Sequence, residues 1–374
     1  MKLGSGDDDM ILEAEPSFRN ARVKPQIVPY MWFKNFRNRK PYHGNLESCC
    51  EVWFSAGDAA SVGICYGRLG DDLPSEQEVV DLYQSNDITR MRLYDPNPNT
   101  LQALQGTNIE LLLDVPNSDL QSLTDPSAAR TLAENNIQNY LDVKFRYITV
   151  GNKIDPNNGN SRFVNFVLEA MRNVHQAIVD AGLADQIKVS TATYTGLLSN
   201  TYPPSVGEFH DNVKSFIEPI IRFLRKNNLS MLANIYPYFA CRDNPNISLP
   251  YSLFTSGPLV NDNGLVYSNL FDAMLDAYNA AQTRLGGGDL NIVVSESGWA
   301  PYGHRVATPE NVATYYQKSV EHVKEDNGTL ARPENSIETC LFAMFNENSN
   351  EGDEYERHFG LFFPDQGSKY ELSF

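Results

Sequence analysis

Eight short runs of apolar, often β-branched residues alternate with longer amphipathic stretches from residue 59 to the end of the chain. Several runs are apolar at consecutive positions, which is typical of parallel strands buried on both faces. Eight such strands separated by helices predict an α/β protein, a (β/α)8 TIM barrel, with residues 59–374 as a single domain. The predicted strands are Ser61–Tyr66, Ile88–Tyr94, Asn108–Val115, Phe145–Asn152, Lys188–Thr193, Met231–Tyr236, Leu290–Ser295 and Ile337–Phe345.

The stretches between these runs have helical spacing. Pro74–Tyr83, Phe163–Ile178 and Leu270–Tyr278 each carry apolar residues three or four positions apart. An open doubly wound sheet is the alternative architecture, and it usually has a glycine-rich phosphate turn after its first strand. The corresponding turn here, Gly67–Gly70, lacks the G-x-G-x-x-G spacing, so the barrel is favoured.

The first part of the chain differs in composition from the barrel region. The first sixty residues carry eight basic and eight acidic residues, whereas the remaining 314 carry the whole net charge of -17. An acidic tract at Asp7–Asp9 and a basic, aromatic cluster at Met31–Lys40 show neither helical nor strand periodicity. We expect residues 1–58 to form a disordered leader, and the start lacks the pattern of a signal peptide.

Charge and composition exclude several classes of function. A net charge of -17 repels phosphate backbones and anionic lipids, so we expect neither a nucleic-acid nor a membrane partner. The six histidines and five cysteines show no metal-ligand spacing, and we expect no metal and no cofactor. Cys65 and Cys340 lie within apolar runs, which predicts buried thiols.

Aromatic and polar residues gather at the ends of the predicted strands, where the active site of a barrel lies. One aromatic residue alone is more often part of the core, but several at one face favour an aromatic-lined cleft suited to a sugar polymer. Glu296 is the strongest candidate for a catalytic carboxylate because it follows a predicted buried strand and precedes Ser297 and Gly298. The other strand ends carry Tyr66, Tyr94, Asn152, Lys153, Tyr194, Tyr236, Phe239, Trp299 and Glu347.

Five segments of the chain match a known family: Val62–Gly67, Met91–Pro96, Leu232–Tyr238, Val294–Trp299 and Phe359–Phe362. Through them the chain resembles the plant endo-β-1,3-glucanases of glycoside hydrolase family 17, from about Ser61 to Phe374. The resemblance implies a barrel enzyme, a monomer without cofactor, that performs retaining hydrolysis of β-1,3-glucan in carbohydrate metabolism or plant defence.

The resemblance also implies roles for individual residues. It makes Glu296 the nucleophile, and it puts the general acid/base at the last position of a Val-Gly-Asn-Glu segment, which is Lys153 in this chain. Three further positions depart from the family pattern: Asn346 replaces an aspartate, Asn350 a lysine and Ala300 a proline. The residues expected to bind substrate are Tyr94, Asn152, Tyr236, Phe239, Trp299, Glu347 and Glu356.

Lysine at position 153 changes the expected chemistry. The acid/base must both donate and accept a proton near working pH, and an unperturbed lysine has a pKa of about 10.4. We therefore expect a Lys153–Glu296 ion pair and strongly impaired hydrolysis. Asp155 is a conceivable substitute acid, although a loop carboxylate without catalytic role is favoured. Three explanations compete: an inactive glucan-binding pseudoenzyme, a single-base change or sequence error, and a working enzyme with rescued chemistry.

Three tripeptides fit the N-glycosylation pattern, beginning at Asn228, Asn246 and Asn327. Such tripeptides also arise by chance and support secretion only weakly. The family resemblance implies an extracellular, cell-wall location, although no signal peptide is seen in the chain.

Overall fold

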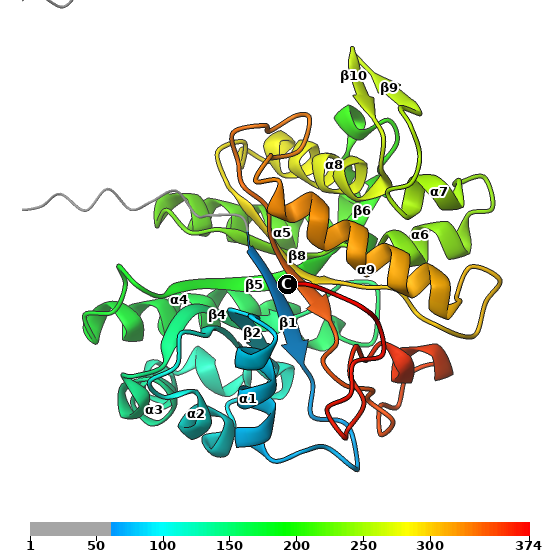
Figure 1. Cartoon of the computed structure of the whole chain (residues 1–374). Coiled ribbons are helices and arrows are strands. Elements are labelled where there is room, and N and C mark those ends of the chain that lie inside the picture. Colours follow the sequence, from blue (N-terminus) through cyan, green and yellow to red (C-terminus); the bar gives the residue numbers. More distant parts are fainter. Residues whose placement is uncertain (1–60) are drawn as a thin grey trace, which may run out of the picture. The chain divides into compact units, whose positions relative to one another are not determined.

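The computed structural model of the chain describes residues 61–374, and the leader predicted at residues 1–58 lies outside the described residues. Eight parallel strands close into a barrel in the order β1-β12-β11-β8-β5-β4-β3-β2 (Figure 1). They are β1 (Ser61–Tyr66), β2 (Arg90–Leu93), β3 (Glu110–Val115), β4 (Lys144–Asn152), β5 (Lys188–Tyr194), β8 (Met231–Asn234), β11 (Ile292–Ser297) and β12 (Glu338–Phe342). The predicted (β/α)8 TIM barrel is confirmed, and each predicted run overlaps one barrel strand, although β4, β5 and β11 extend one or two residues beyond the predicted bounds.

Helices follow the strands and cover the outside of the barrel (Figure 1). The α-helices are α1 (Glu76–Ser85), α2 (Pro98–Leu104), α3 (Pro126–Asn136), α4 (Val164–Asp180), α5 (Asp211–Lys226), α6 (Pro237–Asp243), α7 (Leu249–Ser252), α8 (Leu270–Arg284) and α9 (Pro309–Lys324). Local sequence explains where several begin. Ser75 and Glu78 form a capping box at the start of α1, and the Asn269 side chain accepts the Asp272 N–H at the start of α8.

Shorter elements lie in the loops. Two antiparallel hairpins, β6 (Leu198–Asn200) with β7 (Glu208–Phe209) and β9 (Val260–Asp262) with β10 (Leu265–Tyr267), were not expected from the sequence pattern. The 3-10 helices are η1 (Asn117–Asp119), η2 (Ser122–Thr124), η3 (Gln138–Tyr140), η4 (Ser161–Phe163), η5 (Thr195–Leu197), η6 (Pro204–Val206) and η7 (Glu354–His358).

The barrel interior changes character along its axis. Buried side chains of Leu112, Tyr147, Ala192, Leu232 and Val293 form a separate apolar cluster. Near the strand starts, Glu338 accepts hydrogen bonds from Arg146 and Tyr147 and pairs with Arg90. This packing closes the amino end of the barrel, which leaves the carboxyl end for a ligand site.

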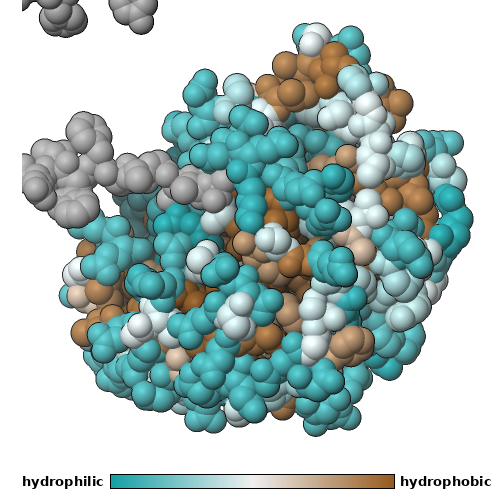
Figure 2. Space-filling view, viewed as in Figure 1, coloured by the Kyte–Doolittle hydropathy of each residue, from teal (hydrophilic) through white to brown (hydrophobic). Residues whose placement is uncertain are grey.

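The surface is mostly hydrophilic in the view of Figure 2, with an apolar patch over the β9–β10 hairpin. Leu259, Leu265 and Val266 are the exposed apolar residues of that region. Within residues 61–374, no helix combines the length and apolarity needed to cross a membrane. The same part of the chain holds no cluster of three or more His, Cys, Asp or Glu that could bind a metal ion. Cys65 and Cys340 are buried free thiols, as predicted.

Candidate active site

Glu296 lies at the carboxyl end of β11, inside the barrel mouth. The register between β11 and β8 shifts between Val294 and Glu296, so a bulge lies next to the carboxylate. Its side chain is almost completely buried. Bulges beside active sites commonly re-aim a side chain. The predicted nucleophile is therefore a buried group at the end of the strand that the sequence indicated.

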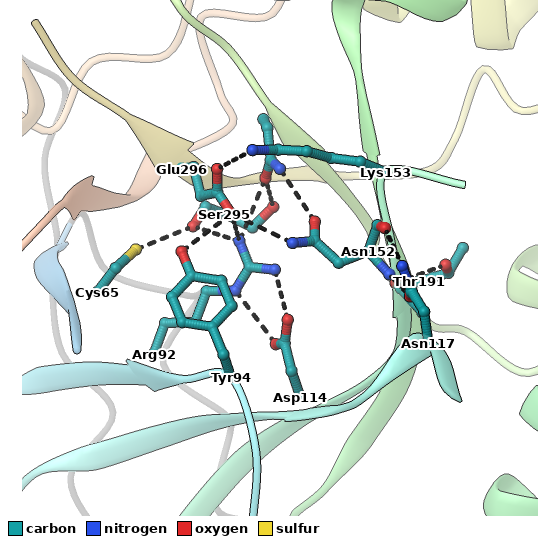
Figure 3. Close-up of polar contacts among 12 residues, drawn as sticks. Cys65, Arg92, Tyr94, Asp114, Asn117, Asn152, Lys153, Thr191, Ser295 and Glu296 are labelled. Carbon is teal, nitrogen blue, oxygen red and sulfur yellow. Dashed lines mark hydrogen bonds and ion pairs between the residues drawn. The ribbon is translucent and has the colours of Figure 1, made fainter. Parts of the chain in front are cut away.

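Four side chains lie within 3.0 Å of the Glu296 carboxylate, two at each oxygen. Arg92 and the Tyr94 hydroxyl both donate to Oε1 at 2.9 Å. The Tyr236 hydroxyl donates to Oε2 at 3.0 Å, and the Lys153 ammonium lies 3.0 Å from the same atom. Figure 3 shows Lys153 reaching Glu296 from β4, on the side away from Arg92 and Tyr94. Each carboxylate oxygen thus already has a cationic partner.

Lys153 occupies an unusual backbone position directly after β4. Its φ is 54°, and Gly151, two residues earlier, has a φ of 87°. The Lys153 N–H donates to the Ala192 carbonyl at 2.9 Å. This geometry directs the side chain across the barrel mouth, where its ammonium also lies 5.9 Å from the centre of the Tyr236 ring. The side chain is 46% exposed, so it faces the open cleft while it holds Glu296. The ion pair expected from the sequence is present.

The positive charges around Glu296 affect its pKa more strongly than its burial does. Burial alone raises the pKa of this carboxyl, but the Lys153 charge and then the Arg92 charge lower it to about 2. Burial raises the pKa of the Tyr94 and Tyr236 hydroxyls, so both stay protonated and donate. Glu296 is therefore fully ionised at neutral pH, as a nucleophile requires, but its charge is neutralised by Lys153.

Arg92 and Asp114 support the carboxylate from below, and sequence reasoning assigned them no role. Arg92 is fully buried and binds Asp114 through two nitrogens, at 3.1 and 2.6 Å. It also donates to the Ser295 carbonyl at 3.0 Å. The available signal was a charged residue inside each of two apolar strand runs, because such a charge needs a buried partner.

Asn152 belongs to a polar network that joins η1, β4, β8 and β11. Its backbone exchanges two hydrogen bonds with the Asn117 side chain, at 2.8 and 2.9 Å. Its side-chain oxygen accepts from Asn234 at 3.1 Å, and its amide is 3.5 Å from Glu296 Oε1. Ser295 in turn donates to Asn234 at 2.7 Å. The network orients the Asn152 amide toward Glu296.

Glu347 is a second buried carboxyl at the barrel mouth. The Asn350 amide donates to its Oε2 at 3.2 Å. Its Oε1 occupies the space beside Gly67, where an added Cβ would lie only 1.4 Å away, so a side chain at position 67 would displace the Glu347 carboxyl. Burial, together with the charge of Glu296, raises the pKa of Glu347 to about 7. Glu356, in η7, is half-buried, and its charge also raises that pKa.

The structure gives Trp299 a different environment from the one predicted. The ring is fully buried, its N–H donates to the Val306 carbonyl at 2.8 Å, and it packs against Tyr315 and Tyr238 at 5.3 Å. A ring enclosed by neighbours has no free face for a sugar. The predicted substrate contact of Trp299 is at odds with this burial, whereas Phe239 stays partly exposed.

Asp155 is buried, and both oxygens of its carboxylate accept hydrogen bonds from nearby residues. One oxygen accepts from the Tyr194 hydroxyl and the other from the Asn157 N–H at 2.7 Å. These bonds hold the loop after β4. The predicted reading of Asp155 as a structural loop carboxylate is consistent with them.

A cavity of about 840 Å³ adjoins the site on the side of α6 and α7. Tyr236 and Phe239 line its inner end, and Tyr236 is the residue that donates to Glu296 Oε2. Tyr202, Asn246 and Leu259 line it farther out. The carboxylate site therefore opens into an elongated, partly aromatic space.

A (β/α)8 barrel with a buried, hydrogen-bonded carboxylate at a strand end and an aromatic-lined cleft defines the class of glycoside-cleaving barrels. Comparison with known proteins narrows this class to one family. The family profile "Glycosyl hydrolases family 17" matches residues 62–374, and the chain belongs to this family.

Characterised relatives and solved structures agree with this assignment. The chain is 56% identical to a glucan endo-1,3-beta-glucosidase of Vitis vinifera, over 84% of this chain and 92% of the relative. It is 52% identical to glucan endo-1,3-beta-glucosidase A of Solanum lycopersicum, over 84% and 93%. The solved structure of CJP38, a beta-1,3-glucanase and allergen of Cryptomeria japonica pollen, is 40% identical and covers 84% of this chain and 99% of its own, with a TM-score of 0.82.

Proposed function

We propose that this chain binds β-1,3-glucan in the cleft above Glu296 and hydrolyses it only weakly. The relatives named above, which are glucan endo-1,3-beta-glucosidases, support the substrate. One observation carries the proposed impairment, namely the 3.0 Å ion pair between Lys153 and Glu296. The family resemblance assigns the acid/base to position 153, so the same residue both removes that group and occupies the nucleophile.

Retaining hydrolysis requires two carboxyl groups about 5–5.5 Å apart on either side of the scissile bond. One attacks the anomeric carbon, and the other protonates the departing oxygen and then activates water. A lysine ammonium has no lone pair with which to accept a proton, so position 153 supplies no carboxyl that could perform both steps. Loss of general acid/base assistance alone costs roughly 10²–10⁴ in rate.

A catalytically inactive glucan-binding protein is the second candidate, and it differs from the first only in residual turnover. The binding residues support it, because Tyr94, Asn152 and Tyr236 keep their positions around Glu296. Rescue of catalysis by Asp155 has less support, since both its oxygens are already engaged.

The test measures reducing-sugar release from a linear β-1,3-glucan by the native chain and by Lys153→Glu, together with binding of both to the same glucan. We expect binding by both and substantial turnover only by the variant. Similar turnover by both proteins would refute the proposed impairment. Failure of both to bind the glucan would refute the proposed substrate.

We also propose that the chain is a monomer that enters the secretory route toward the cell wall. The asparagines of all three glycosylation tripeptides are exposed, so each could carry the N-linked glycan that is added in this route. Fractionation of plant cells that express the full chain, with blotting of apoplastic fluid, tests the location, and sedimentation analysis tests the monomer.

A further inference from the structure

The three glycosylation tripeptides lie at different ends of the barrel. Asn228 follows α5 and precedes β8, and Asn327 follows α9 and precedes β12. Segments that lead from a helix into a strand lie at the amino end of the barrel. Asn246 instead follows β8 and α6, so it lies at the carboxyl end, where Glu296 is found. Only one of the three tripeptides therefore shares a face with the site.

Asn246 is well placed for modification. It lies in the loop between α6 and α7, which are neighbours in Figure 1, and it is exposed. Its backbone N–H donates to the Asn244 side chain at 3.0 Å, which shapes the loop. Among the residues that the structure describes, none forms a hydrogen bond with the Asn246 side-chain amide. Ser248, the third residue of the tripeptide, caps α7 without a side-chain hydrogen bond.

Asn246 also lines the cavity that leads to the nucleophile. The same cavity of about 840 Å³ is lined by Phe239 and by Tyr236, whose hydroxyl donates to Glu296. Tyr202 and Leu259 also line it. A bulky group attached to Asn246 would stand at the rim of this space, between solvent and the aromatic residues.

We propose that Asn246 carries an N-linked glycan that narrows the cavity beside Tyr236 and restricts the entry of long glucan chains from that side. The proposal rests on the proposed function and on the proposed secretory route. In the transfer, Asn246 Nδ2 bonds to the anomeric carbon of a lipid-diphosphate-linked oligosaccharide. The bond from that carbon to the phosphate oxygen breaks, the lipid diphosphate leaves with the electron pair, and Nδ2 loses one proton.

The test compares the full chain secreted from plant cells behind a cleavable signal with the same chain made in bacteria, which lack this modification. Glycopeptide mass spectrometry measures occupancy of Asn246. Binding to a long linear β-1,3-glucan is then measured for wild type and Asn246→Gln from both sources. We expect an occupied Asn246 and at least about threefold tighter binding by the secreted variant than by the secreted wild type. The bacterial pair measures the effect of the amide substitution alone, and the threefold difference is counted over and above it.

Matched controls separate the glycan from the side chain. Ser248→Ala abolishes the acceptor without touching Asn246 and should reproduce the effect of Asn246→Gln. Asn228→Gln, at the opposite end of the barrel, should leave glucan binding unchanged. An unoccupied Asn246 in the secreted chain overturns the proposal, as does an occupied Asn246 whose removal leaves binding unchanged. If no form binds glucan, the proposed function and the restriction of entry both fail, while mass spectrometry still decides occupancy.

Discussion

Replacing Lys153 with glutamate should convert the ion pair at the barrel mouth into a pair of coupled carboxyls. In the native chain, the Lys153 ammonium lies 3.0 Å from Glu296 Oε2 and helps to hold the pKa of Glu296 at about 2. Lys153→Glu removes that cation and adds an acid at the position where the family resemblance expects the acid/base. We expect hydrolysis to rise by roughly 10²–10⁴ in kcat.

The magnitude of the coupling follows from the separation that retaining hydrolysis requires. Two carboxylates about 5–5.5 Å apart repel each other by about 3 kcal/mol at an effective dielectric constant of about 20. Since one pKa unit corresponds to about 1.4 kcal/mol, this raises the pKa of one carboxyl by about 2 units, from about 4.3 to between 6 and 7. The variant should therefore show a bell-shaped pH profile with maximal activity on the acid side of neutrality.

The assay is reducing-sugar release from a linear β-1,3-glucan between pH 3 and pH 9. Lys153→Gln is the matched control, because it removes the ion pair without supplying an acid. If blockage of Glu296 by the ammonium were the whole defect, Lys153→Gln would be as active as Lys153→Glu. That result would refute the argument that the missing acid limits the native chain.

Three further predictions concern single side chains. Lys153→Gln should destabilise the fold by roughly 1 kcal/mol above about pH 4.3, a value discounted because Lys153 is half-exposed. The depressed pKa of Glu296 contributes stability that is present above about pH 4.3 and lost as the pH falls through about 2, so the acid-unfolding midpoint followed by circular dichroism should rise in this variant. Trp299→Phe should lower the free energy of unfolding by about 1–3 kcal/mol in urea titration but leave glucan affinity unchanged, whereas a large loss of affinity would mean that the ring contacts sugar. Asn350→Lys should lower the pKa of Glu347 from about 7 by roughly 1–3 units, measured by NMR titration, because an ammonium would replace the amide at 3.2 Å; an unchanged value would show that Glu347 is not controlled from position 350.

The barrel was predictable because its signals are local. A strand buried on both faces must be apolar at consecutive positions, and an amphipathic helix must repeat its apolar residues every three or four positions. Both patterns can be recognised in the sequence without knowledge of the tertiary contacts. The same reasoning located Glu296 near the carboxyl end of a buried strand, although the structure extends β11 through Ser297 and so includes Glu296 in the strand.

Tertiary structure alone decided which groups meet. Arg92 and Asp114 come from neighbouring strands, and only the closed barrel makes them a buried pair beneath Glu296. Trp299 stands three residues after the nucleophile, but α9 and α6 supply the tyrosines that enclose it. The sequence by itself determined the order of the strands along the chain and the presence of a lysine at position 153. The burial of a ring and the partner of a charge depend on side chains from distant segments, so they exist only once the barrel has closed.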